Sequence, residues 1–106
     1  MHLFKRKSEE YNLIKKSKYF DSGWYLKKNP DVAQAKMDPV EHYLQFGWKE
    51  GRNPSLGFNS EYYSANYMSG HDCEICPLVY YEKYGKYRGD DTVDLSGAQI
   101  KFPDRS

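Results

Sequence analysis

One histidine and two cysteines stand close together in the segment HDCEIC. Cys73 and Cys76 have the Cys-x2-Cys spacing of half a structural zinc site, and His71 would add a nitrogen ligand beside them. A closed site needs a fourth ligand, which His42 or His2 would have to supply from a distant part of the chain. The segment therefore leaves two interpretations open, a small zinc-binding protein and ordinary loop thiols, of which the second is simpler.

The sequence indicates no catalytic site, either at these cysteines or at its paired carboxylates. Thioredoxin-like redox chemistry uses a Cys-x2-Cys in a βαβ context that this sequence lacks. A cysteine nucleophile would need a group that orients its base and an oxyanion site, and no pattern supplies either. The adjacent carboxylates Glu9 and Glu10 point apart on a helix, as do Asp90 and Asp91, so both pairs predict solvated charges. We expect no catalytic activity and no cofactor.

Length and composition predict a single domain over residues 1–106. Leu, Ile, Val and Phe number only 19, but eleven tyrosines and two tryptophans add large apolar rings that can anchor a core. The net charge is +1, although residues 1–28 carry eight Lys and Arg against three Asp and Glu. This basic N-terminus predicts a solvated helix face, with weak contact to an anionic membrane surface as the alternative.

Two further features bear on location and partners. No apolar run reaches the length of a secretory signal or a membrane span, so we expect a cytoplasmic protein, peripheral to the inner membrane if its N-terminus binds lipid. A DNA-reading helix-turn-helix needs basic side chains on its second helix. The candidate helix from Pro39 carries Glu41, His42 and Gln45 instead. We therefore expect no nucleic-acid partner.

The chain contains an internal repeat with an offset of 38 residues. FDSGWY at 20–25 returns as FNSEYY at 58–63, which defines repeat 1 over residues 20–57 and repeat 2 over residues 58–89. The residues that carry the repeat are Phe20, Asp21, Trp24, Tyr25, Pro39, Tyr43, Phe46, Gly47, Gly51, Phe58, Asn59, Tyr62, Tyr63, Pro77, Tyr81, Tyr84, Gly85 and Gly89. Their aromatic members are the ones expected to fill the interior.

Each repeat predicts a helical hairpin, so the expected fold class is all-α. Asp21 and Asn59 are predicted N-cap residues, and Asp38 followed by proline starts the second helix of repeat 1. Gly47 and Gly85 then stand where a left-handed C-cap ends a helix. One N-terminal helix over residues 8–19 precedes the repeats. Residues 90–106 predict an irregular tail, in which Leu95, Ile100 and Phe102 could cover the last repeat.

The assembled residues FDSGWYLKKNPDVAQAKMDPVEHYLQFGWKEGRNPSLGFNSEYY resemble a bacterial repeat of the form FDxxWYLxxNPDV…DPLxHYLxxGxxEGRxP. That repeat accompanies glycosyltransferases and rhamnan-synthesis-type proteins of surface polysaccharide clusters. The resemblance covers about residues 13–89, and repeat 2 departs from the pattern at residues 67–70 and 86–90. It implies a non-catalytic interaction module in cell-surface polysaccharide biosynthesis, which binds a glycosyltransferase, an assembly partner or a glycan.

Within the segment HYLQFGWKEGRNP, two residues are the candidate surface contacts. A phosphate cradle places its glycines before a helix N-terminus, whereas these glycines follow a predicted helix. Trp48 and Arg52 do not recur in repeat 2, so the interior of a repeat does not explain them. Tryptophan and tyrosine rings stack on sugar faces, and Trp48 is therefore the better candidate for an exposed contact.

Overall fold

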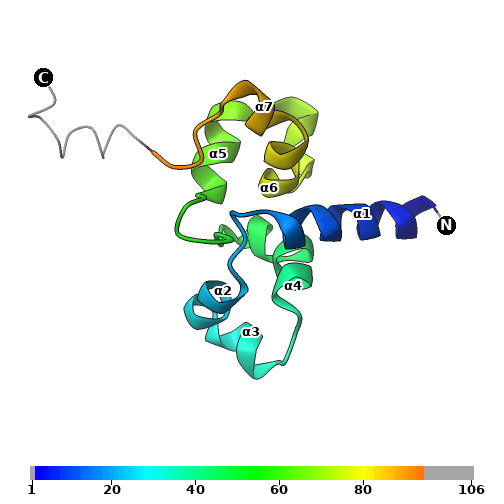
Figure 1. Cartoon of the computed structure of the whole chain (residues 1–106), viewed down its shortest axis with the longest axis vertical. Coiled ribbons are helices and arrows are strands. Elements are labelled where there is room, and N and C mark those ends of the chain that lie inside the picture. The colour runs from blue at the N-terminus through cyan, green and yellow to red at the C-terminus, as the bar shows by residue number, and fades with distance from the viewer. Residues whose placement is uncertain (1, 95–106) are drawn as a thin grey trace, which may run out of the picture.

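Helices joined by short turns make up the protein (Figure 1). The computed structural model describes the backbone of residues 2–94 and the side chains of residues 9–94. The elements in chain order are α1 (His2–Lys16), α2 (Ser22–Lys28), α3 (Pro30–Gln34), α4 (Pro39–Gln45), the 3-10 helix η1 (Gly47–Glu50), α5 (Ser60–Tyr67), the 3-10 helix η2 (Gly70–Glu74), α6 (Pro77–Tyr80), the π-helix η3 (Tyr81–Gly85) and α7 (Lys86–Arg88). The predicted all-α class is confirmed, because the described residues contain no strand beyond one isolated bridge.

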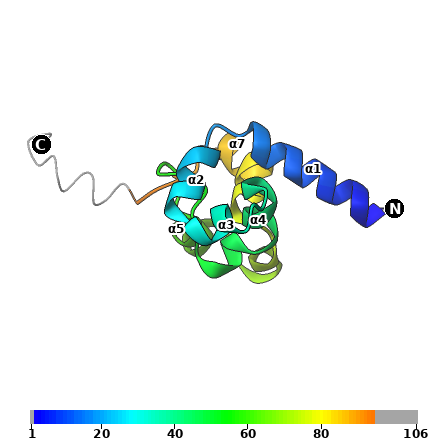
Figure 2. The ribbon, with the colours of Figure 1, turned by 90° about the horizontal axis from the view of Figure 1, so that it is seen from below.

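Helix α1 lies between two groups of helices. Helices α2, α3 and α4 lie on one side of it, and α5, α6 and α7 lie on the other (Figure 1). It packs against α4 in the first group and against α6 in the second, where Ile14 is fully buried. A view turned by 90° shows its N-terminal turns projecting beyond both groups (Figure 2).

The predicted N-cap residues hold the starts of the helices. The Asp21 side chain accepts a hydrogen bond from the Trp24 backbone N–H at 3.0 Å, and Asn59 accepts one from Tyr62 at 2.9 Å. Asp38 likewise caps α4. These bonds satisfy N–H groups that the first turn of a helix leaves without an internal partner. Asp21 and Asn59, which stand 38 positions apart, thus have the same role, whereas Cys76, 38 positions after Asp38, makes no side-chain cap.

The N-terminal helix differs from its predicted bounds of 8–19. It begins at His2, since residues 2–7 hold no glycine or proline and are mostly good helix formers. It ends at Lys16, where the Ser17 hydroxyl accepts from the Tyr19 backbone N–H at 3.0 Å and turns the chain. Of the predicted tail 90–106, residues 90–94 are non-helical; Leu95, Ile100 and Phe102 lie outside the described residues.

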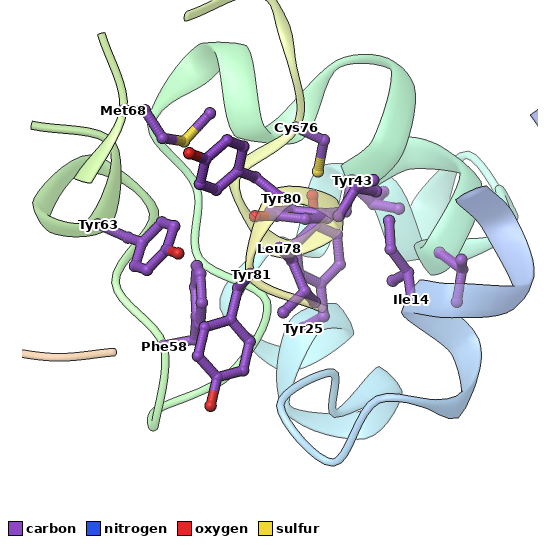
Figure 3. Close-up of a cluster of buried hydrophobic side chains, with 13 residues drawn as sticks. Ile14, Tyr25, Tyr43, Phe58, Tyr63, Met68, Cys76, Leu78, Tyr80 and Tyr81 are labelled. Carbon is purple, nitrogen blue, oxygen red and sulfur yellow. The ribbon is translucent and has the colours of Figure 1, made fainter. Parts of the chain in front are cut away.

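The core is built from tyrosines (Figure 3). Tyr25, Tyr43 and Tyr63 are fully buried, and each hydroxyl has a partner. Tyr25 bonds His42 Nδ1 at 2.8 Å, and Tyr43 bonds the Ser60 hydroxyl at 2.7 Å. Among the described side chains of residues 9–94, no buried nitrogen or oxygen lacks a hydrogen bond. Aromatic rings therefore replace aliphatic bulk without leaving polar groups unsatisfied, as a buried hydroxyl requires.

The predicted left-handed C-caps at Gly47 and Gly85 are not found. Gly51 and Gly89 carry the positive φ instead, 79° at each. A C-cap in this conformation favours glycine, because a β-carbon would crowd the backbone. The left-handed residue therefore follows η1 and α7, four positions later than predicted in each case, and Gly47 and Gly85 must be glycine for another reason.

Candidate binding grooves

The cysteine segment does not gather metal ligands. Cys76 is buried at the start of α6, whereas His71 and Cys73 are exposed on η2. Burial raises the pKa of the Cys76 thiol to about 12, so it is a protonated core group near Tyr43 (Figure 3). Among the side chains that the structure describes, those of residues 9–94, no three His, Cys, Asp or Glu are grouped to hold a metal ion, and His2 lies outside this range. The geometry therefore gives no support to the zinc hypothesis or to a Cys76 nucleophile.

Arg52, predicted as a surface contact, is engaged within the fold. Its Nη1 and Nη2 atoms donate to the two carboxylate oxygens of Asp31 at 3.0 and 2.9 Å. Nη1 also donates to the Asn29 side chain at 2.8 Å, and Nε pairs with Glu50 at 2.8 Å. The hydrogen bonds from Arg52 lower the pKa of the Asp31 carboxyl. This fork ties the start of α3 to the turn after η1, so the guanidinium is a clamp rather than a free contact.

The positions 38 residues after Glu50 and Arg52 carry the opposite charges. Glu50 and Arg52 correspond to Arg88 and Asp90, which also pair, with Arg88 Nη2 2.6 Å from Asp90 Oδ2. Tyr63 donates its hydroxyl proton to the same carboxylate oxygen at 2.7 Å. Burial alone would raise the pKa of Asp90, but the hydrogen bonds from Arg88 and Tyr63 lower it. Both pairs of positions thus hold an ion pair, one beside η1 and one beside α7.

Two aromatic residues that recur at the 38-residue offset are exposed, contrary to the prediction that they fill the interior. Phe46 is 47% exposed and Tyr84 is 51% exposed. A third recurring aromatic position, Trp24, is only partly buried and lies outside the core cluster. Core packing therefore does not explain why an aromatic ring stands at position 46 and again at position 84.

Each of these exposed rings lines a groove. The first groove has a volume of about 560 Å³ and is lined by Leu44, Gln45, Phe46, Trp48, Lys49, Glu10, His71, Glu74, Ile75 and Cys76. The second groove has a volume of about 820 Å³ and is lined by Glu82, Lys83, Tyr84, Lys86, Tyr87, Glu9, Asn12, Leu13 and Lys16. Taken in order, each of the first five residues lining the second groove stands 38 positions after its counterpart in the first groove. Both grooves are thus lined by corresponding segments, residues 44–49 and 82–87, and residues of α1 also line each groove.

The second groove combines tyrosines with lysines. Tyr87 is 76% exposed, and Lys86 Nζ lies 5.3 Å from the centre of its ring. Lys86 also pairs with the buried carboxylate of Glu82 at 2.9 Å, and this hydrogen bond raises the pKa of the lysine. Lys16 and Lys83 are exposed and form no ion pair with a described carboxylate. The groove therefore offers flat apolar rings and positive charge together.

Trp48 lies at the edge of the first groove. Its ring packs partly against the core, and its Nε1 donates to the Leu44 carbonyl at 3.0 Å. It also lines a smaller hollow of about 280 Å³ with Glu61 and Ala65. The predicted contact at Trp48 is thus a half-buried ring edge, whose polar atom already has a partner.

Sequence periodicity missed the grooves for a physical reason. Phe46 follows Tyr43 by three positions, so a continuing helix would keep both on one face. The helix ends at Gln45, and Phe46 has φ −130° and ψ −44°, which turns it outward. In the second unit, the π-helix Tyr81–Gly85 adds a residue to the turn and changes the phase at Tyr84. The usable signal was the aromatic residue directly before a glycine, at Phe46 and again at Tyr84.

Comparisons of the chain with protein-family models, curated proteins and solved structures give no match. Over residues 2–94, no helix combines the length and the apolar character needed to cross a bilayer. The chemistry of the two grooves is therefore the main structural basis for assigning a function.

Proposed function

We propose that this chain is a non-catalytic helical interaction module whose two grooves bind a glycan. The observation that carries the proposal is the pair of exposed rings, Phe46 and Tyr84, in grooves built from corresponding residues. An exposed aromatic face offers apolar area to the C–H face of a sugar, and adjacent polar side chains can bond its hydroxyls. Gln45 and Lys49 supply such groups in the first groove, and Lys83 and Lys86 in the second.

Two corresponding grooves suit a ligand that repeats itself. A polysaccharide presents the same sugar unit at regular intervals, so one chain could engage both grooves at once. Once the polymer is held in one groove, its next sugar units are present at high effective concentration near the other groove. The overall affinity therefore rises without new contacts. This property fits a polymer better than a single small molecule.

The biological setting of the proposal comes from the resemblance to the bacterial repeat that accompanies glycosyltransferases. We place the module in cell-surface polysaccharide biosynthesis, on the cytoplasmic side of the inner membrane, where it would hold the glycan for a glycosyltransferase or an assembly partner. Direct contact with such a protein is the second candidate.

A titration tests the proposal directly. The ¹⁵N-labelled protein is titrated with rhamno-oligosaccharides and with a panel of other oligosaccharides, and the backbone amide resonances are followed by NMR. We expect shifts for Phe46, Lys49, Tyr84 and Tyr87, since these residues line the grooves. No shifts with any member of the panel would overturn glycan binding and favour the protein partner.

A further inference from the structure

The second groove differs from the first in charge. Three lysines line it, Lys16, Lys83 and Lys86, against two glutamates, and one of these glutamates is neutralised by Lys86. An adjoining hollow of about 510 Å³ shares Lys16 and Lys86 and adds Lys18. The first groove has one lysine, Lys49, against two glutamates. The sign of the local field therefore favours an anion at the second groove and not at the first.

The apolar part of the second groove is aromatic rather than aliphatic. Leu13 is the one aliphatic residue in its lining, whereas Tyr84 and Tyr87 are both more than half exposed. A partner helix docks through several aliphatic anchors in an apolar groove. Exposed rings beside ammonium groups instead suit a ligand with apolar faces and negative charges.

We propose that the second groove selects acidic sugars, those that carry a carboxylate or another fixed negative charge. Tyr84 and Tyr87 stack on the sugar rings, and Lys16 and Lys83 donate charge-assisted hydrogen bonds to the anionic groups. Lys86 stays with Glu82 and positions the wall of the groove, since its ammonium is already paired. This assignment rests on the proposed glycan function and adds the class of ligand.

Isothermal titration calorimetry at low salt compares a short oligogalacturonate with the neutral malto-oligosaccharide of the same length. We expect the acidic ligand to bind about tenfold more tightly, the scale of one charge-assisted hydrogen bond. The double variant Lys16→Ala/Lys83→Ala should lose this preference. The matched control Lys27→Ala/Lys28→Ala removes the same charge from exposed positions on α2 and should retain it.

The outcomes separate this inference from the proposed function. Equal affinity for both sugars would overturn the acidic preference and leave glycan binding intact. No binding of either sugar to the intact protein would overturn the acidic preference, and the panel titration would then decide separately whether the grooves bind any glycan. Co-sedimentation with phosphatidylglycerol vesicles that Tyr84→Ala/Tyr87→Ala abolishes, without oligogalacturonate binding, would assign the surface to a membrane and overturn the inference as well.

Discussion

Gly47 lies so close to the Tyr25 hydroxyl that a β-carbon at this glycine would overlap the phenolic oxygen. The second unit has the same relationship between Gly85 and Tyr63, 38 positions further along the chain. Neither glycine has a positive φ. These glycines are therefore required by the space that a buried tyrosine takes, and the two units solve the same packing problem in the same way.

Replacing Gly47 by alanine should destabilise the protein by about 1–3 kcal/mol, the usual cost of an extra methyl group in a filled core. The cost should be smaller in a Tyr25→Phe background, where the overlapping oxygen is gone. Chemical denaturation of the four proteins in this double-mutant cycle measures the difference. Additive effects of the two substitutions would contradict the steric explanation.

The control for this cycle is Gly23→Ala. An added β-carbon at Gly23 would meet no atom closer than 3.7 Å, and the residue lies within α2. Alanine there should leave stability unchanged or raise it by up to about 1 kcal/mol, because it favours the helix over the unfolded chain.

The ion-pair clamp at Arg52 should depend on the shape of the guanidinium. We expect Arg52→Lys to lower the melting temperature nearly as much as Arg52→Ala, since an ammonium cannot bridge both Asp31 oxygens and the Asn29 side chain together. Lys27→Ala, which removes an exposed charge, should have little effect. A melting temperature for Arg52→Lys equal to that of the wild type would contradict the clamp.

Stability should fall as the pH drops below about 6.5. Burial lowers the pKa of His42 in the folded state, with Arg52 adding to the shift while Glu50 and Asp31 oppose it. As the pH falls, His42 is therefore protonated in the unfolded chain before it is protonated in the folded protein. The stability that neutral His42 contributes is fully present above the ordinary pKa of 6.5 and is lost below it. Melting temperatures across this range should show a flatter profile for His42→Gln, whereas the exposed His71→Gln should keep the wild-type profile.

The two cysteines should differ in reactivity. Cys73 is exposed, whereas Cys76 is buried with its pKa raised to about 12, and attack on a thiol reagent requires an accessible thiolate. We expect one cysteine to react in the native protein and both to react in denaturant. In Cys73→Ser, the native protein should be unreactive. Rapid labelling of native Cys73→Ser would show that Cys76 is not a core residue.

Local rules predicted the fold class and the starts of α2, α4 and α5, since caps and prolines act within one turn of the chain. Asp21, Asp38 and Asn59 each cap a helix as such rules expect. They could not predict the clamp between Asp31 and Arg52, which joins segments 21 positions apart only after folding. They also placed Phe46 in the core, because periodicity assumes that the helix continues past Gln45.

The sequence also could not show which recurring aromatic residues are buried and which are exposed. Recurrence of an aromatic at the 38-residue offset predicts core packing, yet Phe46 and Tyr84 recur and are exposed. Conversely, Trp48 and Arg52 do not recur and are partly or wholly engaged within the fold. A repeated residue can serve either the interior or a surface that is itself repeated, and only the position of the side chain distinguishes the two.

The effect of Phe46→Ala/Tyr84→Ala on glycan binding and on stability, measured on the same samples, tests most directly whether the two grooves bind the glycan. Both rings are about half exposed, and they contact His42 and Tyr80 respectively, so the melting temperature should fall by several degrees while the protein stays folded. Affinity for an oligosaccharide identified by titration should fall at least about tenfold, a loss of about 1.4 kcal/mol. The control Leu56→Ala removes an exposed apolar side chain outside both grooves and should leave affinity unchanged. Undiminished binding by a folded Phe46→Ala/Tyr84→Ala protein would contradict the assignment of the two grooves.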